Sequence, residues 1–246
     1  MPLTTGEPRV ALITGAGSGI GLSCALALDA VGVDVVLQGI DRPQLEEAAS
    51  LFTREPGVSV GDIAEPDTSR RALDDTLESF GQLDILIANA GLYLGSDGWD
   101  VPLQRVDSVV RINILGVMHA VHTVVPHLLA NGGGDIVVTS SIAGHVDLAH
   151  EAVYSSAKHA VASFVNATRS RLAGKNIRIG AVAPGVVATP LWAINAHDTG
   201  ADIPALVRDG RALLPQDVAS SVMFMLQQPR YVNIRDIVIL PTDQAI

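Results

Sequence analysis

The sequence is poor in cysteine and in positive charge, and each shortage excludes a class of protein. Its 246 residues contain one cysteine, Cys24, so neither an internal disulfide nor a cysteine-based zinc site can form. Lys and Arg number 16 against 26 Asp and Glu, which gives a formal net charge of −10. Because binding to nucleic-acid phosphates requires clustered basic side chains, this balance argues against a nucleic-acid-binding protein.

Long apolar runs are also missing. No apolar stretch reaches the roughly 20 residues that a membrane-spanning helix needs. The stretch that comes closest, residues 117–130, is interrupted by His119, His122 and His127, whose spacing does not match a zinc signature. Residues 1–9 lack the apolar core of a secretory signal. We therefore expect a cytoplasmic protein with no metal site and no membrane or nucleic-acid partner.

Apolar residues themselves are abundant at 48%, although aromatic residues make up only 4% of the chain. They occur in short β-branched runs that alternate with longer segments of helical period, which predicts an α/β fold with a parallel sheet buried on both faces. The expected strands are residues 10–14, 34–38, 58–61, 84–88, 135–139, 177–182 and 232–240. The expected helices are residues 20–31, 68–80, 106–129, 154–172 and 218–226.

The organisation of the chain indicates one domain over residues 1–246, because no linker or low-complexity stretch divides it. Gly32, Gly81 and Gly174 follow three of the expected helices, where glycine favours a left-handed C-terminal cap. The least regular stretch, residues 186–215, is expected to form a lid over the site.

A glycine-rich turn joins the first expected strand to the first helix. Residues 10–14 lead directly into Gly15, Gly17, Gly19 and Gly21. Glycines allow the backbone to turn tightly and to approach a pyrophosphate, whose charge is held at the helix N-terminus. The position of this turn at the first strand–helix junction predicts dinucleotide binding rather than an ordinary tight turn.

An acidic residue after the second strand commonly accompanies such a turn, because it holds the adenosine ribose hydroxyls. Asp41 lies 20 residues beyond Gly21 and suits this role, but it suits equally well the N-cap of a helix beginning near Pro43. Arg42 could instead meet the 2′-phosphate of NADP. The glycine turn itself carries no basic residue, so NAD is the expected cofactor and NADP the alternative.

Three polar residues predict an acid/base site. Tyr154 and Lys158 are four residues apart on an expected helix and therefore share one face. A tyrosine hydroxyl has an ordinary pKa near 10, and a nearby ammonium favours the phenolate and lowers that pKa. Ser141 follows the fifth expected strand, at the edge of the sheet where α/β proteins bind ligands.

Together these residues make the chain resemble the short-chain dehydrogenase/reductase family along nearly its whole length. The matching segments are residues 14–21, Asp62, residues 89–91, Asn113, Ser141, residues 154–158 and residues 184–189. The resemblance implies a doubly wound (Rossmann) parallel sheet of about seven strands with helices on both faces, and an NAD(P)-dependent alcohol dehydrogenase.

The resemblance also assigns roles. Tyr154 would be the acid/base, Lys158 would lower the pKa of Tyr154 and hold the nicotinamide ribose, and Ser141 would hydrogen-bond the reacting oxygen. Asn113 would support a water molecule in the proton relay. With Asp41, the expected cofactor contacts are Gly15, Ser18, Gly19, Ile20, Asp62, Ile63, Asn89, Ala90, Gly91, Tyr154, Lys158, Pro184, Gly185, Val187 and Thr189.

Two positions depart from the family pattern and concern the cofactor. Ala88 stands where the family often has a first asparagine. Gly39 stands where many NAD-using members have an acid, so Asp41 would have to reach from two residues further on. These departures leave the choice between NAD and NADP open. The expectation that the chain binds a dinucleotide is unchanged.

The substrate prediction rests on local likeness. Residues 88–95, 180–189 and 232–242 are similar to ribitol-like polyol dehydrogenases of the family, which implies the interconversion of a secondary alcohol and a ketone. An NADPH-dependent carbonyl or 3-hydroxy acid dehydrogenase/reductase is the alternative. A catalytically inactive dinucleotide-sensing protein is the alternative from another class, although the complete set of acid/base residues argues against it. Family likeness also implies a homotetramer.

The loop before Tyr154 carries polar residues that bear on the substrate. His145, Asp147, His150 and Glu151 could hydrogen-bond several substrate hydroxyls, or could form an ordinary solvated loop. In the expected lid, Trp192 could close an apolar wall over the nicotinamide or could simply anchor the lid.

Overall fold

Apolar, β-branched runs form one seven-stranded parallel sheet in the computed structural model, which describes residues 8–95, 99, 101–191 and 202–245. The strands are β1 (Val10–Thr14), β2 (Asp34–Gly39), β3 (Gly57–Val60), β4 (Ile85–Ala88), β5 (Gly134–Thr139), β6 (Ile177–Pro184) and β7 (Asp236–Ile239). Their order in the sheet is β3-β2-β1-β4-β5-β6-β7. Every residue of β1, β4, β5 and β6 is buried, as expected for strands covered on both faces.

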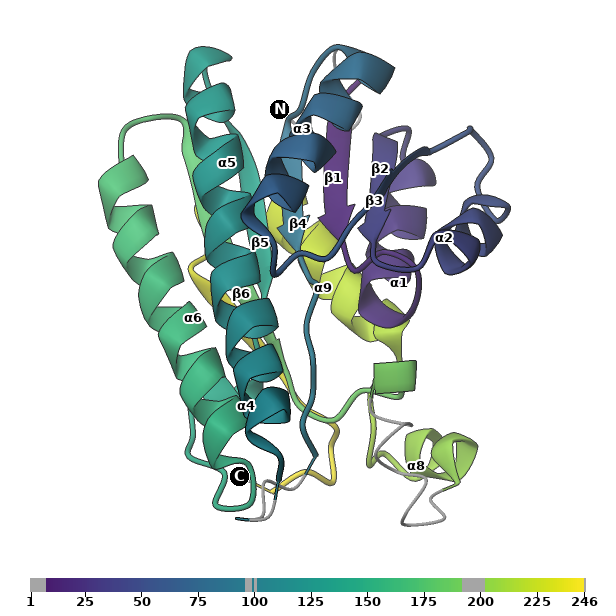
Figure 1. The fold of residues 1–246 in the computed structure, drawn as a ribbon, viewed down its shortest axis with the longest axis vertical. Coiled ribbons are helices and arrows are strands. Elements are labelled where there is room, and N and C mark those ends of the chain that lie inside the picture. Colours follow the sequence, from purple (N-terminus) through teal and green to yellow (C-terminus); the bar gives the residue numbers. More distant parts are fainter. Residues whose placement is uncertain (1–7, 96–98, 100, 192–201, 246) are drawn as a thin grey trace.

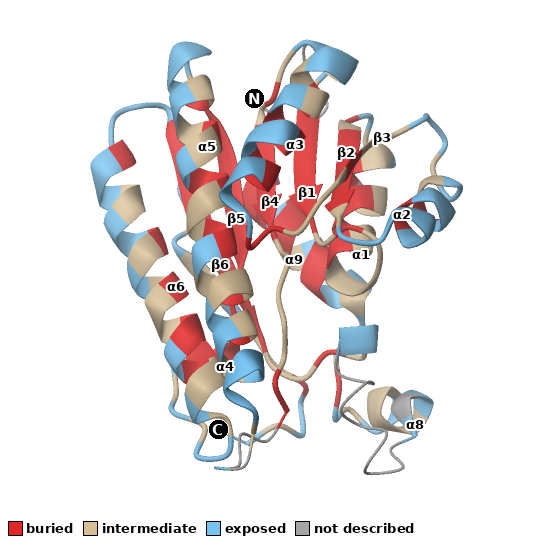
Figure 2. Cartoon of the chain, viewed as in Figure 1, coloured by how far each residue is buried: buried red, intermediate tan, exposed pale blue. Residues whose placement is uncertain are grey.

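Helices cover both faces of this sheet (Figure 1). They are α1 (Gly19–Asp29), α2 (Arg42–Ala49), α3 (Pro66–Phe80), α4 (Leu103–Val110), α5 (Val117–Ala130), α6 (Ala152–Leu172), α8 (Ile203–Arg208) and α9 (Pro215–Gln227). Buried residues of α3, α5 and α6 form one core with the sheet, and those of α1 and α9 form a second core on the opposite face. Figure 2 shows the buried strands between helices whose outer sides are exposed. The predicted doubly wound α/β fold is therefore confirmed.

The strand order places a crevice at the middle of the sheet. From β1 the chain continues to β2 and β3 on one side, whereas β4 pairs with the other side of β1 and leads to β5 and β6. The loops that leave β1 and β4 thus turn in opposite directions. In open α/β sheets, ligands bind at this switch point, outside the carboxyl ends of the strands.

Glycines that follow three of the helices, and the N-cap residue of α2, have the predicted conformations. Gly32, Gly81 and Gly174 all have positive φ, of 86°, 75° and 76°. Gly81 is the left-handed C-cap of α3. The predicted helix near Pro43 is α2, and its N-cap is Asp41, whose carboxylate accepts a hydrogen bond from the Gln44 backbone N–H at 3.0 Å.

Three predicted elements differ from the structure. The single helix expected over residues 106–129 is α4 and α5 joined by a π-helical segment, η1 (Arg111–Gly116). The last strand is shorter than expected, because the Asn233 side chain hydrogen-bonds both the N–H and the C=O of Ile179 in place of a strand ladder. The predicted lid contains a short helix, α8, which begins after Asp202.

The run Leu103–Ala130 is long and apolar enough to cross a membrane by length and composition alone, since it contains an 18-residue window with a mean hydropathy of 1.4. A core helix of a globular fold passes the same test. In this fold, Val117, Val121 and Val124 belong to the core that α5 shares with the sheet.

Candidate active site

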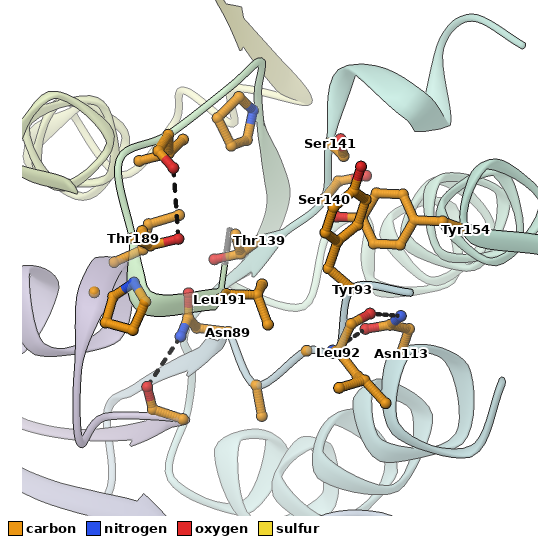
Figure 3. Close-up of a pocket in the computed structure, with 18 of the residues that line it drawn as sticks. Asn89, Leu92, Tyr93, Asn113, Thr139, Ser140, Ser141, Tyr154, Thr189 and Leu191 are labelled. Atoms are coloured by element: carbon orange, nitrogen blue, oxygen red, sulfur yellow. Dashed lines mark hydrogen bonds between the residues drawn. The ribbon is translucent and has the colours of Figure 1, made fainter. Parts of the chain in front are cut away.

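A cavity of about 520 Å³ opens at the carboxyl ends of the strands. The segments that follow β1, β4, β5 and β6 contribute to its walls, and α6 closes one side (Figure 3). The predicted site residues that line it are Gly15, Ser18, Gly19, Ile20, Asn89, Ala90, Gly91, Asn113, Ser141, Tyr154, Lys158, Pro184, Gly185, Val187 and Thr189. Asp41, Asp62 and Ile63 do not line this cavity.

The glycine turn requires its glycines. Gly15 and Gly19 have φ values of 64° and 55°, in the left-handed region that side chains with a Cβ rarely adopt. A Cβ on Gly21 would lie 2.2 Å from the carbonyl oxygen of Gly15, so this position also needs a glycine for close packing. Ser18, the N-cap of α1, makes no side-chain capping hydrogen bond. The turn and the first N–H groups of α1 therefore have the form of a phosphate-binding site.

Asn89 and Thr14 hold this turn against the end of β4. The Thr14 hydroxyl accepts hydrogen bonds from the backbone N–H groups of Asn89 and Ala90, both at 3.0 Å. The Asn89 side-chain amide donates to the carbonyl oxygens of Thr14 and Gly15, at 3.1 and 3.2 Å. These four bonds join the two strands at the switch point and fix the floor of the cavity.

The carboxylates expected at the adenosine end of the cofactor accept hydrogen bonds from backbone N–H groups close to them in the chain. The Asp41 carboxylate caps α2, which confirms the N-cap interpretation, while its ribose role stays a prediction. The Asp62 carboxylate accepts a hydrogen bond from the N–H of Ala64 at 2.9 Å, and Ile63 is buried, with its side chain beside Gly116. Adenine contacts by Asp62 and Ile63 stay predictions.

Asn113 lies in the π-helical segment η1 and is buried. Its side-chain oxygen accepts from the N–H of Leu92 at 2.9 Å, and its amide donates to the C=O of Leu92 at 2.7 Å. Figure 3 shows these two bonds between η1 and the segment after β4. Asn113 thus fixes the position of the cavity wall next to Gly91. A π-helical segment at this point is typical of a functional site.

Tyr154, Ser141 and Lys158 meet at one wall of the cavity. Lys158 is buried, its Nζ donates to the Thr139 carbonyl oxygen at 3.1 Å, and it lies 5.5 Å from the centre of the Tyr154 ring. Burial lowers the pKa of Lys158 to about 8. The geometry brings the predicted acid/base set together, with the lysine beside the phenol ring.

The pKa of Tyr154 corrects one part of the sequence prediction. Burial raises this pKa to about 12, a hydrogen bond with Ser141 lowers it, and the charge of Glu151 raises it further. Lys158 is not among the groups that shift it. The desolvation of the phenolate therefore outweighs the stabilisation that the lysine was expected to provide.

One further side chain in the wall, Tyr93, was not assigned to the site from the sequence, and it contacts both Tyr154 and Glu151. Tyr93 packs edge-on against Tyr154, with ring centres 5.1 Å apart, and its hydroxyl donates to the carboxylate of Glu151. Tyr93 and Glu151 are 58 residues apart in the chain, and no local pattern indicates that they meet. Of the four polar residues predicted before Tyr154, only Glu151 lines the cavity; His145 instead lies 3.8 Å from Asp236.

Two buried hydroxyl groups in the cavity wall have no hydrogen-bond partner among the residues described. These are Thr139 Oγ1 and Ser140 Oγ, which follow one another at the end of β5. A buried polar atom without a partner destabilises a fold, so these positions are typical of atoms that bind a ligand. The glycine turn and these two hydroxyl groups fit a dinucleotide that has a polar ring system at its reactive end.

The parallel sheet, the glycine turn at its switch point and the Ser–Tyr–Lys wall define a dinucleotide-dependent oxidoreductase. Residues 9–199 match the family described as short chain dehydrogenase, and the chain belongs to this family.

Relatives and solved structures agree with this assignment. An uncharacterised oxidoreductase of Staphylococcus saprophyticus is 32% identical over 239 residues, which cover 96% of this chain and 98% of the relative. An actinorhodin polyketide ketoreductase variant solved with NADPH has a TM-score of 0.87 and 27% identity, covering 95% of this chain and 96% of that one. The 3-ketoacyl-(acyl-carrier-protein) reductase of Brucella melitensis, complexed with NADH, has a TM-score of 0.86 and 27% identity, with 96% and 98% coverage.

Proposed function

We propose that the protein is an NAD(P)-dependent oxidoreductase that interconverts a secondary alcohol and a ketone, with a ribitol-like polyol as substrate. The observation that carries the proposal is the cavity shared by the glycine turn and by Ser141, Tyr154 and Lys158. This cavity lies at the carboxyl ends of the strands of one sheet. Residues proposed to bind the cofactor and residues proposed to contact the substrate therefore line the same cavity.

The cofactor is proposed to be NAD, with NADP as the alternative. The open N–H groups at the start of α1 would hold the pyrophosphate, and Lys158, Thr139 and Ser140 would contact the nicotinamide end. When bound, nicotinamide supplies the chemistry of hydride acceptance and donation. Neighbouring structures with NADPH and with NADH support a nicotinamide dinucleotide and leave both cofactors open.

The choice of NAD rests on the residues around the adenosine ribose. Gln44 and Ile40 line the cavity there, whereas the Arg42 side chain is exposed and lies 3.6 Å from Glu46. No arginine lines the cavity among the residues described, so a 2′-phosphate would require Arg42 to leave Glu46. Comparing the kcat/KM values for NAD and NADP tests this choice.

Tyr154 is the proposed acid/base. A hydroxyl with a pKa of about 12 is protonated at neutral pH, so it can donate a proton to a carbonyl oxygen during reduction. Ser141 would hydrogen-bond the same oxygen and keep it next to the phenol. In the direction of oxidation, Tyr154 must first lose its proton, which the desolvated setting disfavours at neutral pH. The sign of the shift therefore favours reduction at neutral pH and oxidation at alkaline pH.

A carbonyl reductase is the second candidate, because the two solved structures reported above are ketoreductases by name. Its substrate would be a ketone or a 3-hydroxy acid and its cofactor NADPH. A panel of pentitols, hexitols, ketoses and 3-oxo compounds, assayed with all four nicotinamide cofactors, separates the two. No turnover of any pentitol or hexitol would reject the polyol substrate, and no change in cofactor absorbance with any compound would reject an enzyme altogether and favour a dinucleotide-sensing protein.

The assembly is proposed to be a homotetramer, on family likeness. Exposed apolar side chains support a subunit contact. Phe224 of α9 is 55% exposed, Tyr231 between α9 and β7 is 90% exposed, and Val238 of the edge strand β7 is 41% exposed. Light scattering tests this, and a monomer would contradict it. A lid over residues 186–215 also remains a proposal, since residues 192–201, including Trp192, lie outside the described part of the chain.

A further inference from the structure

The cavity wall around Tyr154 carries two charged side chains among the residues described. Among the described residues that line the cavity, Glu151 is the one carboxylate and Lys158 the one cation. All 16 Lys and Arg residues fall within the described ranges, so no lysine or arginine remains to be placed in the wall. Lys158 is buried and already donates to the Thr139 carbonyl.

Glu151 is held close to the reacting group. It is the N-cap residue of α6 and precedes Tyr154 by three positions, which puts both on the first turn of this helix. Tyr93 joins them, because its ring packs on Tyr154 while its hydroxyl donates to the Glu151 carboxylate. Figure 3 shows the Tyr93 and Tyr154 rings side by side at the cavity.

The Glu151 carboxylate makes the proposed acid/base step of Tyr154 harder in the direction of oxidation. Its charge raises the pKa of Tyr154 and so opposes the phenolate. A carboxylate is also an acceptor-only group, which binds hydroxyl donors and repels a second carboxylate or a phosphate. Its position is therefore better explained by substrate selection than by proton transfer.

We infer that Glu151 is a specificity-determining residue that excludes anionic substrates and admits uncharged, hydroxyl-bearing ones. The inference rests on the proposed function, because it concerns the substrate end of the same cavity. It separates the two candidates: a free 3-hydroxy or 3-oxo acid would bring its carboxylate beside Glu151 with no arginine or second lysine to balance it, whereas a polyol or ketose would offer hydroxyl donors.

The experiment compares matched substrates that differ in charge. One pair is a ketopentose and its 5-phosphate, and the other is methyl 3-oxobutanoate and 3-oxobutanoate, each assayed as kcat/KM for carbonyl reduction. For the wild type we expect the uncharged member to be preferred by roughly ten- to a hundredfold in each pair that is turned over, as two like charges in a partly desolvated site require. In Glu151→Gln, that preference should fall by roughly tenfold or more, because kcat/KM for the charged member should rise relative to kcat/KM for the uncharged member.

Two control variants isolate the charge of Glu151. Asp147→Asn removes the same charge four residues earlier, from a fully exposed side chain that does not line the cavity, and should leave the preference unchanged. Tyr93→Phe removes the hydroxyl that donates to Glu151 but leaves the carboxylate, so the preference for uncharged substrates should persist.

The outcomes separate this inference from the proposed function. Equal kcat/KM for charged and uncharged members in the wild type would overturn the inference and leave an oxidoreductase in place. The same result follows if Glu151→Gln keeps the wild-type preference, if Asp147→Asn lowers it as much, or if Tyr93→Phe abolishes it. No reduction of any of the four compounds and no oxidation of any polyol would instead overturn the proposed function, and this inference with it.

Discussion

A cluster of one buried carboxylate and three arginines lies at the opposite end of β5 from Ser141, and it allows a quantitative prediction about stability. Asp135 is 1% exposed and accepts hydrogen bonds from Arg178 Nε at 2.6 Å, from Arg9 Nη2 at 2.7 Å and from Arg230 Nη1 at 2.7 Å. Arg178 also donates to the Leu226 carbonyl at 2.9 Å, at the end of α9. One carboxylate therefore joins β5 and β6 to the residue that precedes β1 and to the segment after α9.

Asp135→Asn keeps the shape of this side chain but removes the charge that the arginines require. Removing one partner of a buried ion pair costs about 3–5 kcal/mol. The Arg9 and Arg230 side chains are 17% and 27% exposed, so water offsets part of this loss and we expect a value near 3 kcal/mol. For a chain of this length, with an unfolding entropy of about 2.1 cal/mol/K per residue, the melting temperature should fall by about 6 °C.

The assay is urea unfolding followed by circular dichroism at a fixed protein concentration, with the slope of the transition checked for a change in the unfolding mechanism. Burial alone would raise the pKa of Asp135, but the hydrogen bond from Arg178 and the charges of Arg9, Arg178 and Arg230 together hold it below its ordinary value of 3.8. The contribution of Asp135 to stability is therefore complete above that pH and is lost as the pH falls through the lowered pKa. The difference between wild type and variant should therefore be constant from pH 7 down to about pH 5 and should shrink only in strong acid.

The matched control for this prediction is Asp243→Asn. Asp243 is 68% exposed on its side chain and lies 3.9 Å from Arg211, so its loss should change the unfolding free energy by less than about 1 kcal/mol. An Asp135→Asn variant whose stability at pH 7 lies as close to wild type as this control would refute the argument that the buried carboxylate stabilises the sheet.

The remaining predictions concern the site. Tyr154→Phe should lower kcat by roughly 10²–10⁴-fold while the affinity for NADH, measured by fluorescence, changes little; comparable turnover would reject Tyr154 as the acid/base. Gly21→Ala places a Cβ 2.2 Å from the Gly15 oxygen, so the cofactor Kd should rise far more than the KM of the carbonyl substrate, and an unchanged Kd would contradict the phosphate-binding assignment. Oxidation of the alcohol should accelerate as the pH rises, because the pKa of Tyr154 is raised, and Glu151→Gln should move that rise to lower pH; a shift to higher pH would contradict the sign of the charge effect.

Sequence patterns predicted the parts of this protein that depend on neighbours along the chain. The left-handed conformation of Gly81 and the Asp41 cap follow from residues a few positions apart. The Tyr154 and Lys158 pair is similarly local, because a helix brings residues four apart to one face.

Other features depend on contacts that no local pattern records. The strand expected over residues 232–240 begins only at Asp236, because Asn233 hydrogen-bonds Ile179, which is 54 residues away. The sequence around Asn113 has an apolar period typical of an α-helix. In the structure, Asn113 lies in a π-helical segment and hydrogen-bonds Leu92, which follows β4. A repeat of 3.6 residues cannot distinguish these two helix types over one turn.

The pKa of Tyr154 shows most clearly why chemistry is harder to predict than position. The sequence places Lys158 one turn from Tyr154 and therefore predicts a lowered pKa, but the direction depends on the balance between that ammonium and the loss of water. Burial lowers the pKa of Lys158 to about 8, so the same desolvation that raises the pKa of Tyr154 also weakens the positive charge that would oppose it. The charge of Glu151 raises the pKa of Tyr154 further. A site built this way holds a protonated tyrosine at neutral pH, and it reaches the phenolate only when positive charge enters the cavity or when the solution becomes alkaline.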